Sequence, residues 1–268
     1  MNLEDFFQLS KLPFGRDIPV ADLWFNADRR EMESRMEHIA RNKGFGIFTG
    51  DAGTGKSTIA RHFAASIDKN KYQVIYLTDS AMTPRNFYWA SLRALGQLPR
   101  FHRIDARQQL QKVLDDIVSG EGKTPVFMID EAHLLSHEML EEVRFLLNVG
   151  MDSTSDLALL LIGQSELREK LQLHINSAIL QRVDLRYHLK ALTLDECITY
   201  IKAHLAAVQA KRDIFTDNAM SLIHDYSGGI PRRINKLALL SLMAATDKQI
   251  ALIDDHLVHL VIEMEFEF

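Results

Sequence analysis

The sequence of 268 residues has one cysteine, few long apolar runs and no excess of positive charge. Its single cysteine, Cys197, excludes an internal disulfide and a cysteine metal cluster, and we expect it to pack as a small hydrophobic residue in a helix. No apolar run approaches the roughly 20 residues of a membrane span. The first residues, "MNLEDFFQLSKLPFG", lack the basic-then-apolar pattern of an export signal. We therefore expect a soluble, cytoplasmic protein that does not contact a membrane.

The charge balance limits the possible partners. With 31 lysines and arginines against 36 aspartates and glutamates, the formal net charge is −5, which argues against a general binder of nucleic acid. Local basic clusters remain compatible with DNA binding, especially where several subunits line up. Hydrophobic residues at 47% and charged residues at 25% are typical of a globular protein of one large domain, or of a medium domain with a small companion.

Strand and helix patterns alternate along the first two thirds of the chain. Because the middle strands are apolar throughout, as in parallel strands covered on both faces, the pattern predicts a three-layer α/β domain with a parallel five-stranded sheet over residues 1–191. The expected strands are 45–49, 72–78, 125–130, 157–163 and 183–189. The expected helices are roughly 57–69, 84–96, 105–118, 136–149 and 165–181.

After about residue 192 the strand patterns stop, and four amphipathic helical patterns follow. The pair Gly228–Gly229 interrupts the chain between two of them. We therefore predict a small helical lid domain over residues 192–268. The residues expected to start its helices are Thr193, Thr216, Pro231 and Asp254.

The clearest motif lies in "FGIFTGDAGTGKSTIARHF", residues 45–63. Residues 50–57 match the P-loop pattern G-x-x-x-x-G-K-[ST] in full, between an expected strand and an expected helix; the alternative is a chance glycine-rich turn. Such glycines let backbone N–H groups surround a phosphate. We predict that Lys56 reaches the β- and γ-phosphates of a nucleotide and that Ser57 ligates Mg²⁺. The predicted binding loop comprises Gly50, Asp51, Ala52, Gly53, Thr54, Gly55, Lys56, Ser57 and Thr58.

A second motif, "VFMIDEAH", is a buried strand pattern that ends in two acids. Asp130 is predicted to hold Mg²⁺ and its hydration shell, and Glu131 to polarise the attacking water. The alternative is a solvated strand end, although adjacent acids after an apolar strand are costly unless they face a metal or a cleft. His133 is interpreted as a capping or packing residue, with a catalytic role left open. The letters DEAH do not indicate a helicase, because such helicases use two RecA-like domains.

Three weaker signals surround the same predicted site. Gln164 ends the fourth expected strand, where it suits a water-orienting or phosphate-sensing role or, alternatively, a polar residue at a helix start. Arg182 precedes the fifth strand. Arg232 and Arg233 open a helix after Pro231, where cations oppose the helix dipole unless an anion such as a triphosphate is held nearby.

In combination, these features resemble those of the AAA+ ATPases. The whole chain is similar to the ExeA-like and TniB-type group, whose transposition helpers are related to TnsC and MuB. The segments that carry this closer resemblance are "LPFGRDIPVADLWFNADRREME", "LTDSAMTPRNFYWASLRALG" and "YSGGIPRRIN".

The resemblance implies roles that the residue patterns alone do not. Arg182 would be an arginine finger that completes the site of a neighbouring subunit, so the active species would be a homo-oligomer, either a ring or a helical filament. Arg232 would be the sensor-2 residue, although the motif does not distinguish it from its neighbour Arg233. Phe14, in the N-terminal segment 1–40, would line the adenine pocket. The cofactors implied are ATP and Mg²⁺.

The resemblance leaves three classes of function open. The favoured one is an ATP-dependent helper that assembles on double-stranded DNA and recruits or activates a transposase; the others are a secretion-associated ATPase and an initiator- or clamp-loader-like switch. Residues 84–107 interleave basic and aromatic residues, which suits contact with a phosphate backbone or, alternatively, a solvated basic face above core aromatics. The candidate DNA contacts are Arg85, Arg93, Arg100, Arg103 and Arg107.

Overall fold

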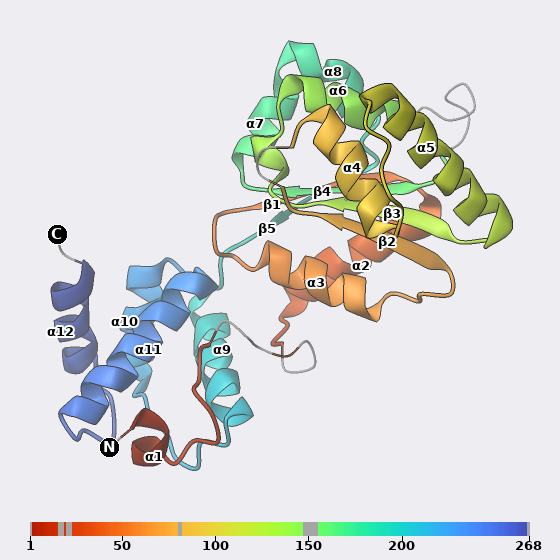
Figure 1. The fold of residues 1–268 in the computed structure, drawn as a ribbon. Coiled ribbons are helices and arrows are strands. Elements are labelled where there is room, and N and C mark those ends of the chain that lie inside the picture. Colours follow the sequence, from red (N-terminus) through yellow and green to blue (C-terminus); the bar gives the residue numbers. More distant parts are fainter. Residues whose placement is uncertain (1, 16–18, 20–22, 80–81, 147–154, 267–268) are drawn as a thin grey trace. The chain divides into compact units, whose positions relative to one another are not determined.

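The computed structural model describes residues 2–15, 19, 23–79, 82–146 and 155–266. The chain divides into two compact units (Figure 1). The α/β unit comprises Ala27–Asp51 and Lys56–Leu189, and the helical unit comprises Met1–Asn26, Ala52–Gly55 and Lys190–Phe268.

A parallel sheet forms the centre of the α/β unit, in the order β2-β3-β4-β1-β5. The predicted five-stranded parallel sheet is therefore confirmed. Because all strands run the same way, their carboxyl ends share one edge, which is where α/β sheets bind ligands. The strands are β1 (Phe45–Gly50), β2 (Tyr72–Leu77), β3 (Thr124–Ile129), β4 (Ala158–Gly163) and β5 (Leu185–Leu189).

Helices cover both faces of this sheet, which gives the predicted three layers (Figure 1). Helices α2 (Ala27–Asn42) and α3 (Lys56–Ser66) pack on one face. The opposite face holds the main apolar core of the unit, which is built on Phe87, Phe127 and Leu159. The elements on that side are α4 (Pro84–Ala94), α5 (Arg103–Asp115), α6 (His137–Leu146), α7 (Glu166–Gln172) and α8 (Ser177–Leu180), with a π-helical turn Asp116–Gly120 and a short 3₁₀ turn, Ala132–Leu134.

Two predicted boundaries in this unit differ from the structure. The helix expected over 165–181 is split into α7 and α8 by a 3₁₀ turn, because the Asn176 side chain donates to the Lys170 carbonyl at 2.7 Å and so competes with the helical bonds. The strand expected from residue 183 begins at Leu185, since the Asp184 carboxylate accepts the Phe45 N–H at 2.7 Å in place of a backbone carbonyl. The last residues of the helix expected over 136–149 lie outside the described residues.

The helical unit contains α1 (Leu3–Phe7), α9 (Leu194–Ala207), α10 (Asp217–Ser227), α11 (Pro231–Asp247) and α12 (Asp255–Phe266). Its predicted helix starts are confirmed by the caps. Thr193 forms a capping box with Glu196, and Thr216 accepts the Ala219 N–H. Pro231 opens α11, and Asp254 accepts the Leu257 N–H at 2.9 Å. The sequence of this unit therefore specifies its helices locally.

The glycine break between α10 and α11 is required by the backbone. Gly228 and Gly229 both have positive φ values, of 63° and 71°. A Cβ at Gly229 would lie 2.1 Å from the Leu192 carbonyl oxygen, so no other residue fits there. Cys197 is fully buried, as predicted, and its burial raises the pKa of the thiol to about 12. Among the described residues, no helix is long and apolar enough to cross a membrane.

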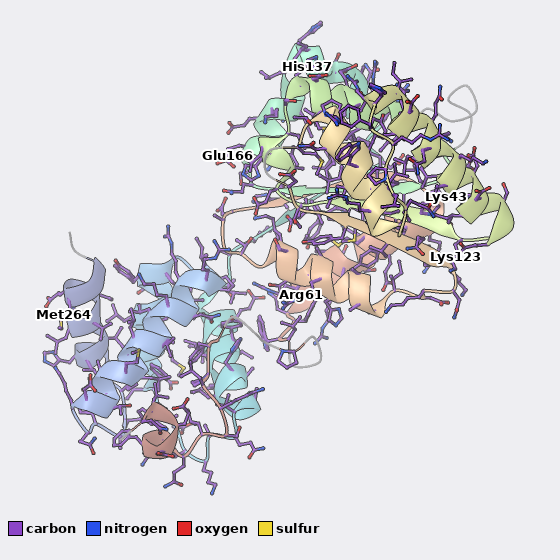
Figure 2. The ribbon with its side chains drawn as sticks, in the orientation of Figure 1. Lys43, Arg61, Lys123, His137, Glu166 and Met264 are labelled. Atoms are coloured by element: carbon purple, nitrogen blue, oxygen red, sulfur yellow. The ribbon has the colours of Figure 1, made fainter. Side chains whose placement is uncertain are left out.

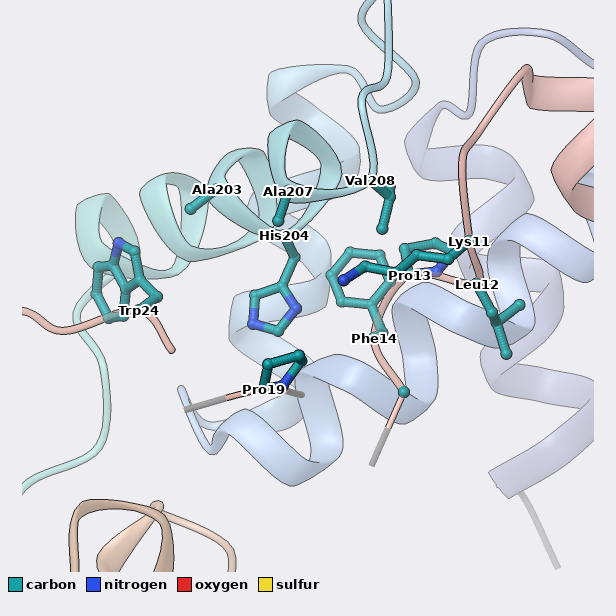
Figure 3. Close-up of a pocket in the computed structure, with 11 residues that line it drawn as sticks. Lys11, Leu12, Pro13, Phe14, Pro19, Trp24, Ala203, His204, Ala207 and Val208 are labelled. Atoms are coloured by element: carbon teal, nitrogen blue, oxygen red, sulfur yellow. The ribbon is translucent and has the colours of Figure 1, made fainter. Parts of the chain in front are cut away.

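Of the predicted N-terminal segment 1–40, residues 1–26 group with the helical unit, whereas residues 27–40 lie in α2 of the α/β unit, where the sequence analysis placed the whole segment. Leu3, Phe7 and Phe14 are buried in the same apolar cluster as the core of α9 to α12, which accounts for this grouping. Phe14, the predicted adenine contact, stacks on His204 with ring centroids 5.3 Å apart. Figure 3 shows the two rings beside a small cavity of about 80 Å³ that Trp24 also lines.

The buried imidazole of His204 makes the stability of this unit depend on pH. Burial lowers its pKa from 6.5 to about 4, so the unfolded chain takes up a proton that the folded unit resists. This contribution is fully present above pH 6.5 and is lost as the pH falls toward 4, by up to about 3 kcal/mol. The free energy of unfolding in urea should fall between pH 7.5 and pH 4.5. In His204→Phe we expect this fall to be smaller by about 2–3 kcal/mol.

The exposed His259 of α12 supplies a matched control. His259→Gln should retain the pH dependence of the unaltered chain. An equal acid loss in His204→Phe and in the unaltered chain would contradict the assignment to His204.

Candidate nucleotide-binding site

The P-loop joins β1 to α3 at the carboxyl edge of the sheet. The Lys56 side chain is buried, and its ammonium donates to the carbonyls of Gly50 at 2.7 Å and of Asp51 at 2.8 Å. Lys56 is also the first residue of α3, with Ser57 exposed beside it. The loop thus offers a held cation and the amino end of a helix, which together suit an anionic phosphate.

The middle of the loop, Ala52–Gly55, groups with the helical unit. Gly53 and Gly55 have φ values of 85° and 105°, which residues with a side chain rarely adopt. The Gly53 carbonyl accepts the backbone N–H of Arg232 at 3.2 Å, and a Cβ at Gly53 would lie 2.8 Å from the Arg232 Cβ. Arg232, and not its neighbour Arg233, therefore contacts the predicted phosphate loop through its backbone.

The two acids of the second motif directly follow β3 at the same edge. The Asp130 carboxylate is buried and held on both oxygens, by the Tyr76 hydroxyl at 2.8 Å and by the Glu131 N–H at 2.8 Å. Glu131 adopts a left-handed backbone with φ 54°, which costs a non-glycine residue free energy and is often found at functional sites. The strain and the fixed carboxylate both argue against an ordinary solvated strand end.

Tyr76 on β2 is a site residue that the sequence analysis missed. Burial, and next the Asp130 carboxylate, raise the pKa of its phenol well above the usual range, so Tyr76 acts as a hydrogen-bond donor. The available signal was a tyrosine near the carboxyl end of the strand pattern, but that pattern does not reveal the sheet order, in which β2 lies beside β3.

We expect Tyr76→Phe to weaken the binding of Mg²⁺ at the nucleotide site. Without the hydroxyl, the Asp130 carboxylate loses one of two fixed bonds and no longer has a single orientation. The Mg²⁺ concentration for half-maximal ATP binding should rise about 3- to 10-fold, measured by titrating Mg²⁺ at fixed ATP. Tyr72→Phe, on the same strand, is the control, and an equal rise in both variants would contradict a specific role for Tyr76.

The end of β4 connects the acids to the P-loop. The backbone N–H of Gln164 donates to Nδ1 of His133 at 3.4 Å, and this nitrogen also lies 3.5 Å from the Glu131 carboxylate. The hydroxyl of the next residue, Ser165, donates to the Asp51 carboxylate at 2.8 Å. Figure 2 shows Glu166 at the start of the following helix, α7. Gln164 and Glu131 are thus linked through His133, and Ser165, which follows Gln164, is linked to the P-loop, all at one edge of the α/β unit.

Arg182 lies where the sequence analysis placed it, between α8 and β5. Its side chain is half-buried, and its backbone N–H donates to the Ile179 carbonyl at 3.0 Å. This contact fixes the backbone of the segment at the end of α8. The trans role of Arg182 depends on a second subunit and remains a prediction.

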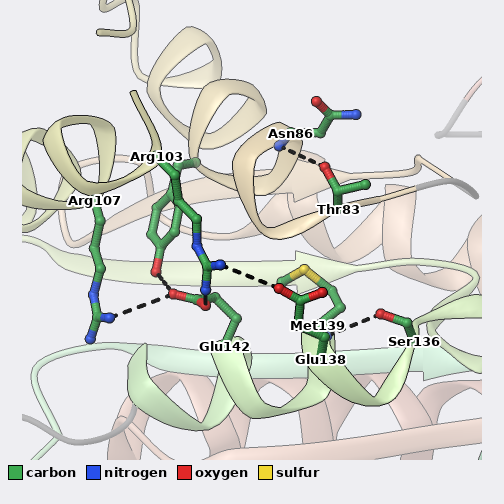
Figure 4. Close-up of polar contacts among 9 residues, drawn as sticks. Thr83, Asn86, Arg103, Arg107, Ser136, Glu138, Met139 and Glu142 are labelled. Carbon is green, nitrogen blue, oxygen red and sulfur yellow. Dashed lines mark hydrogen bonds and ion pairs between the residues drawn. The ribbon is translucent and has the colours of Figure 1, made fainter. Parts of the chain in front are cut away.

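The five predicted DNA-contacting arginines lie on α4, on α5 and on the loop between them. Arg103 pairs with Glu142 and with Glu138 at 3.2 Å, and Arg107 lies 3.7 Å from Glu142 (Figure 4). Glu142 is only 2% exposed, so it depends on these cations for its charge balance. Arg85 and Arg93 lie over the Trp89 ring, at 4.5 and 5.7 Å. Four of the five guanidinium groups therefore have partners within the chain.

The site residues fit a bound magnesium nucleotide. Gly53 and Gly55 supply two loop positions with positive φ and no side chain, and Lys56 supplies a cation. Ser57 and Asp130 supply the hard oxygen ligands that Mg²⁺ prefers. Fold and site together define a P-loop nucleoside triphosphatase. More narrowly, the AAA domain family model matches residues 39–171, which include the P-loop and the Asp130–Glu131 pair, and the chain resembles the ExeA-like group of AAA+ ATPases.

Comparisons with known proteins support this assignment. General secretion pathway protein A of Aeromonas hydrophila is 30% identical over 243 residues, which are 90% of this chain and 44% of that protein. The chain thus spans less than half the length of this relative. Among solved structures, a Drosophila ORC bound to DNA has 15% identity and a TM-score of 0.70. The match covers 99% of this chain and 65% of the ORC chain. ORC2 of Aeropyrum pernix, in ADPNP and ADP complexes, has 18% identity and a TM-score of 0.64. The match covers 93% of this chain and 70% of the ORC2 chain. At these identities the solved structures show the fold alone.

Proposed function

We propose that the chain couples an ATP-hydrolysis cycle to the assembly of a multisubunit complex. The observation that carries the proposal is the arrangement at the sheet edge, where Lys56, Asp130 and Glu131 follow β1 and β3. Bound Mg-ATP supplies the phosphoryl group. Lys56 would neutralise the β- and γ-phosphate oxygens, and Asp130 and Ser57 would hold Mg²⁺. Glu131 would accept a proton from the water that attacks the γ-phosphorus, and ADP would leave.

Arg182, Arg232 and Gln164 complete the proposed cycle. Gln164 reports the γ-phosphate through its contact with His133, which faces Glu131. Arg232 acts as the sensor-2 residue of the same subunit, a role supported by its backbone bond to Gly53. Arg182 reaches the nucleotide of an adjoining copy, so hydrolysis requires a homo-oligomer. Phe14 completes the binding site as the proposed adenine contact, with Arg233 as a secondary phosphate contact.

We propose two settings for this cycle, and the first is DNA transposition. In it, the ATP-bound oligomer forms a ring or filament on double-stranded DNA and recruits a transposase. The support is the resemblance to the TniB-type group. A Drosophila protein of similar fold has been solved bound to DNA.

The second setting is secretion, and a specific observation favours it. The 30% identity to General secretion pathway protein A extends over 90% of this chain, and so includes the helical unit as well as the P-loop. In this setting the oligomer would act on a partner protein of the envelope instead of DNA.

Electron microscopy of the purified protein with duplex DNA, with and without a slowly hydrolysed ATP analogue, separates the two settings. Nucleotide-dependent rings or filaments on DNA, together with DNA-stimulated ATPase activity, are expected for the transposition helper. ATP turnover without any response to DNA would contradict that setting and favour secretion. Failure to bind ATP at all would contradict the proposal in both settings.

A further inference from the structure

Three large apolar side chains project into solvent where α4 passes into α5. Leu98 is 91% exposed, Phe101 66% and Ile104 69%. We call these three residues the apolar tip. Single exposed apolar residues are ordinary, but three within seven positions of the chain expose apolar surface whose burial by a partner would be favourable.

The backbone beneath the apolar tip is held in place. The Gln109 side chain donates to the Leu98 carbonyl at 2.9 Å and accepts the Arg100 N–H at 3.0 Å. The Trp89 indole donates to the Arg100 carbonyl at 2.9 Å. The loop is thus pre-organised by two side chains, which lowers the entropy cost of binding through it.

The surroundings of the apolar tip are basic. The Arg85 guanidinium lies between the rings of Trp89 and Phe101, 4.5 and 4.4 Å from their centroids. An open groove of about 420 Å³ is lined by His102, Arg103, Ile104 and Arg107, of which both arginines also pair with Glu142. In a chain of net charge −5, this local excess of cations is a specific feature of the surface.

We propose that the apolar tip and its basic groove form a docking surface for a partner protein, which binds through an acidic segment with large apolar residues. The apolar residues of the segment cover Leu98, Phe101 and Ile104. Its carboxylates face Arg85, which lies over the Phe101 ring, and Arg100 of the same loop, and not the arginines that pair with Glu142. Exposed aromatic and arginine side chains above a fixed backbone have the composition of protein-interaction hot spots. The inference does not depend on whether the partner belongs to transposition or to secretion.

DNA fits this surface less well. Arg103 and Arg107 already serve the buried Glu142 carboxylate, and moving them to phosphates would leave that charge uncompensated. The three exposed apolar residues gain nothing from a phosphate backbone. Duplex DNA is therefore the alternative that the experiment must distinguish.

The test uses peptide display and variants of the full chain. A random library of about 12-residue peptides is selected on the unaltered protein and counter-selected on the double variant Leu98→Ser with Ile104→Ser. We expect the enriched peptides to combine leucine, phenylalanine or tryptophan with aspartate or glutamate. The synthetic peptide should lose at least about tenfold in affinity on the double variant.

Matched controls make the result specific. Met243→Ser with Leu252→Ser removes two apolar residues that are exposed on the helical unit, and it should keep the peptide affinity within about twofold. The same peptide with lysines in place of its acids should not bind. Basal ATPase activity should be unchanged in both double variants, which also shows that they fold.

Two outcomes would overturn the proposal. One is a selection that yields no peptide able to distinguish the unaltered protein from the Leu98→Ser, Ile104→Ser variant. The other is that this variant loses affinity for an unlabelled duplex competitor while no acidic peptide binds, which would assign the apolar tip to DNA. Either result leaves the proposed ATPase cycle intact, because nucleotide binding is measured separately.

Discussion

Replacing Lys56 by alanine is expected to weaken ATP binding by about 100-fold or more and to abolish measurable turnover. The ammonium is buried and already held by the carbonyls of Gly50 and Asp51, so it is positioned before a phosphate arrives. Truncating one partner of a buried, hydrogen-bonded charge pair costs about 2–5 kcal/mol, which corresponds to this loss. Isothermal calorimetry with ATP and Mg²⁺ measures the affinity directly.

Lys69→Ala is the matched control, since Lys69 is exposed beyond the end of α3. It removes the same charge from the same region and should leave ATP affinity within about twofold. ATP uptake that is intact in Lys56→Ala would show that the loop does not hold the triphosphate, and the assignment of the site would be wrong.

A second large effect is expected from Glu131→Gln, which should slow ATP hydrolysis by about 10²- to 10⁴-fold while ATP still binds. The amide keeps the size and the polar contacts of Glu131 but cannot accept the proton of the attacking water. Because binding is retained, the variant should accumulate in the ATP-bound, assembled state. Single-turnover hydrolysis and light scattering measure the two parts of this prediction.

Glu169→Gln, on the exposed face of α7, controls for loss of a carboxylate near the site. It should hydrolyse ATP at the rate of the unaltered protein. Hydrolysis at that same rate in Glu131→Gln would instead move the base to another group, and His133 would be the first candidate because it lies 3.5 Å from the Glu131 carboxylate.

Much of the fold was predictable because its signals are local. Apolar runs identify the central strands, and Thr193, Thr216 and Pro231 identify helix starts through caps that involve only neighbouring residues. The prediction was less accurate where a distant side chain intervenes. The Asn176 side chain interrupts a continuous helical pattern through its hydrogen bond to the Lys170 carbonyl. The Asp184 side chain bonds the Phe45 N–H, so β5 begins two residues later than the pattern predicts.

The candidate site shows the same division. The P-loop and the Asp130–Glu131 pair are contiguous in sequence, so their spacing is sufficient to find them. Tyr76 was missed because its bond to Asp130 spans 54 residues and depends on β2 lying beside β3. The sequence analysis named Arg103 and Arg107 as candidate DNA contacts, and the structure pairs both with Glu142 of α6.

What the sequence determined by itself is the chemistry of the nucleotide loop and the alternation of strands and helices, because both are encoded in residues that are near neighbours along the chain. Only the tertiary structure decided that Tyr76 fixes Asp130, that the N-terminal segment packs with α9 to α12, and that the α4–α5 loop presents an apolar tip. The physical reason is that burial and pairing arise between residues far apart in sequence, and their partners are set by sheet order and packing.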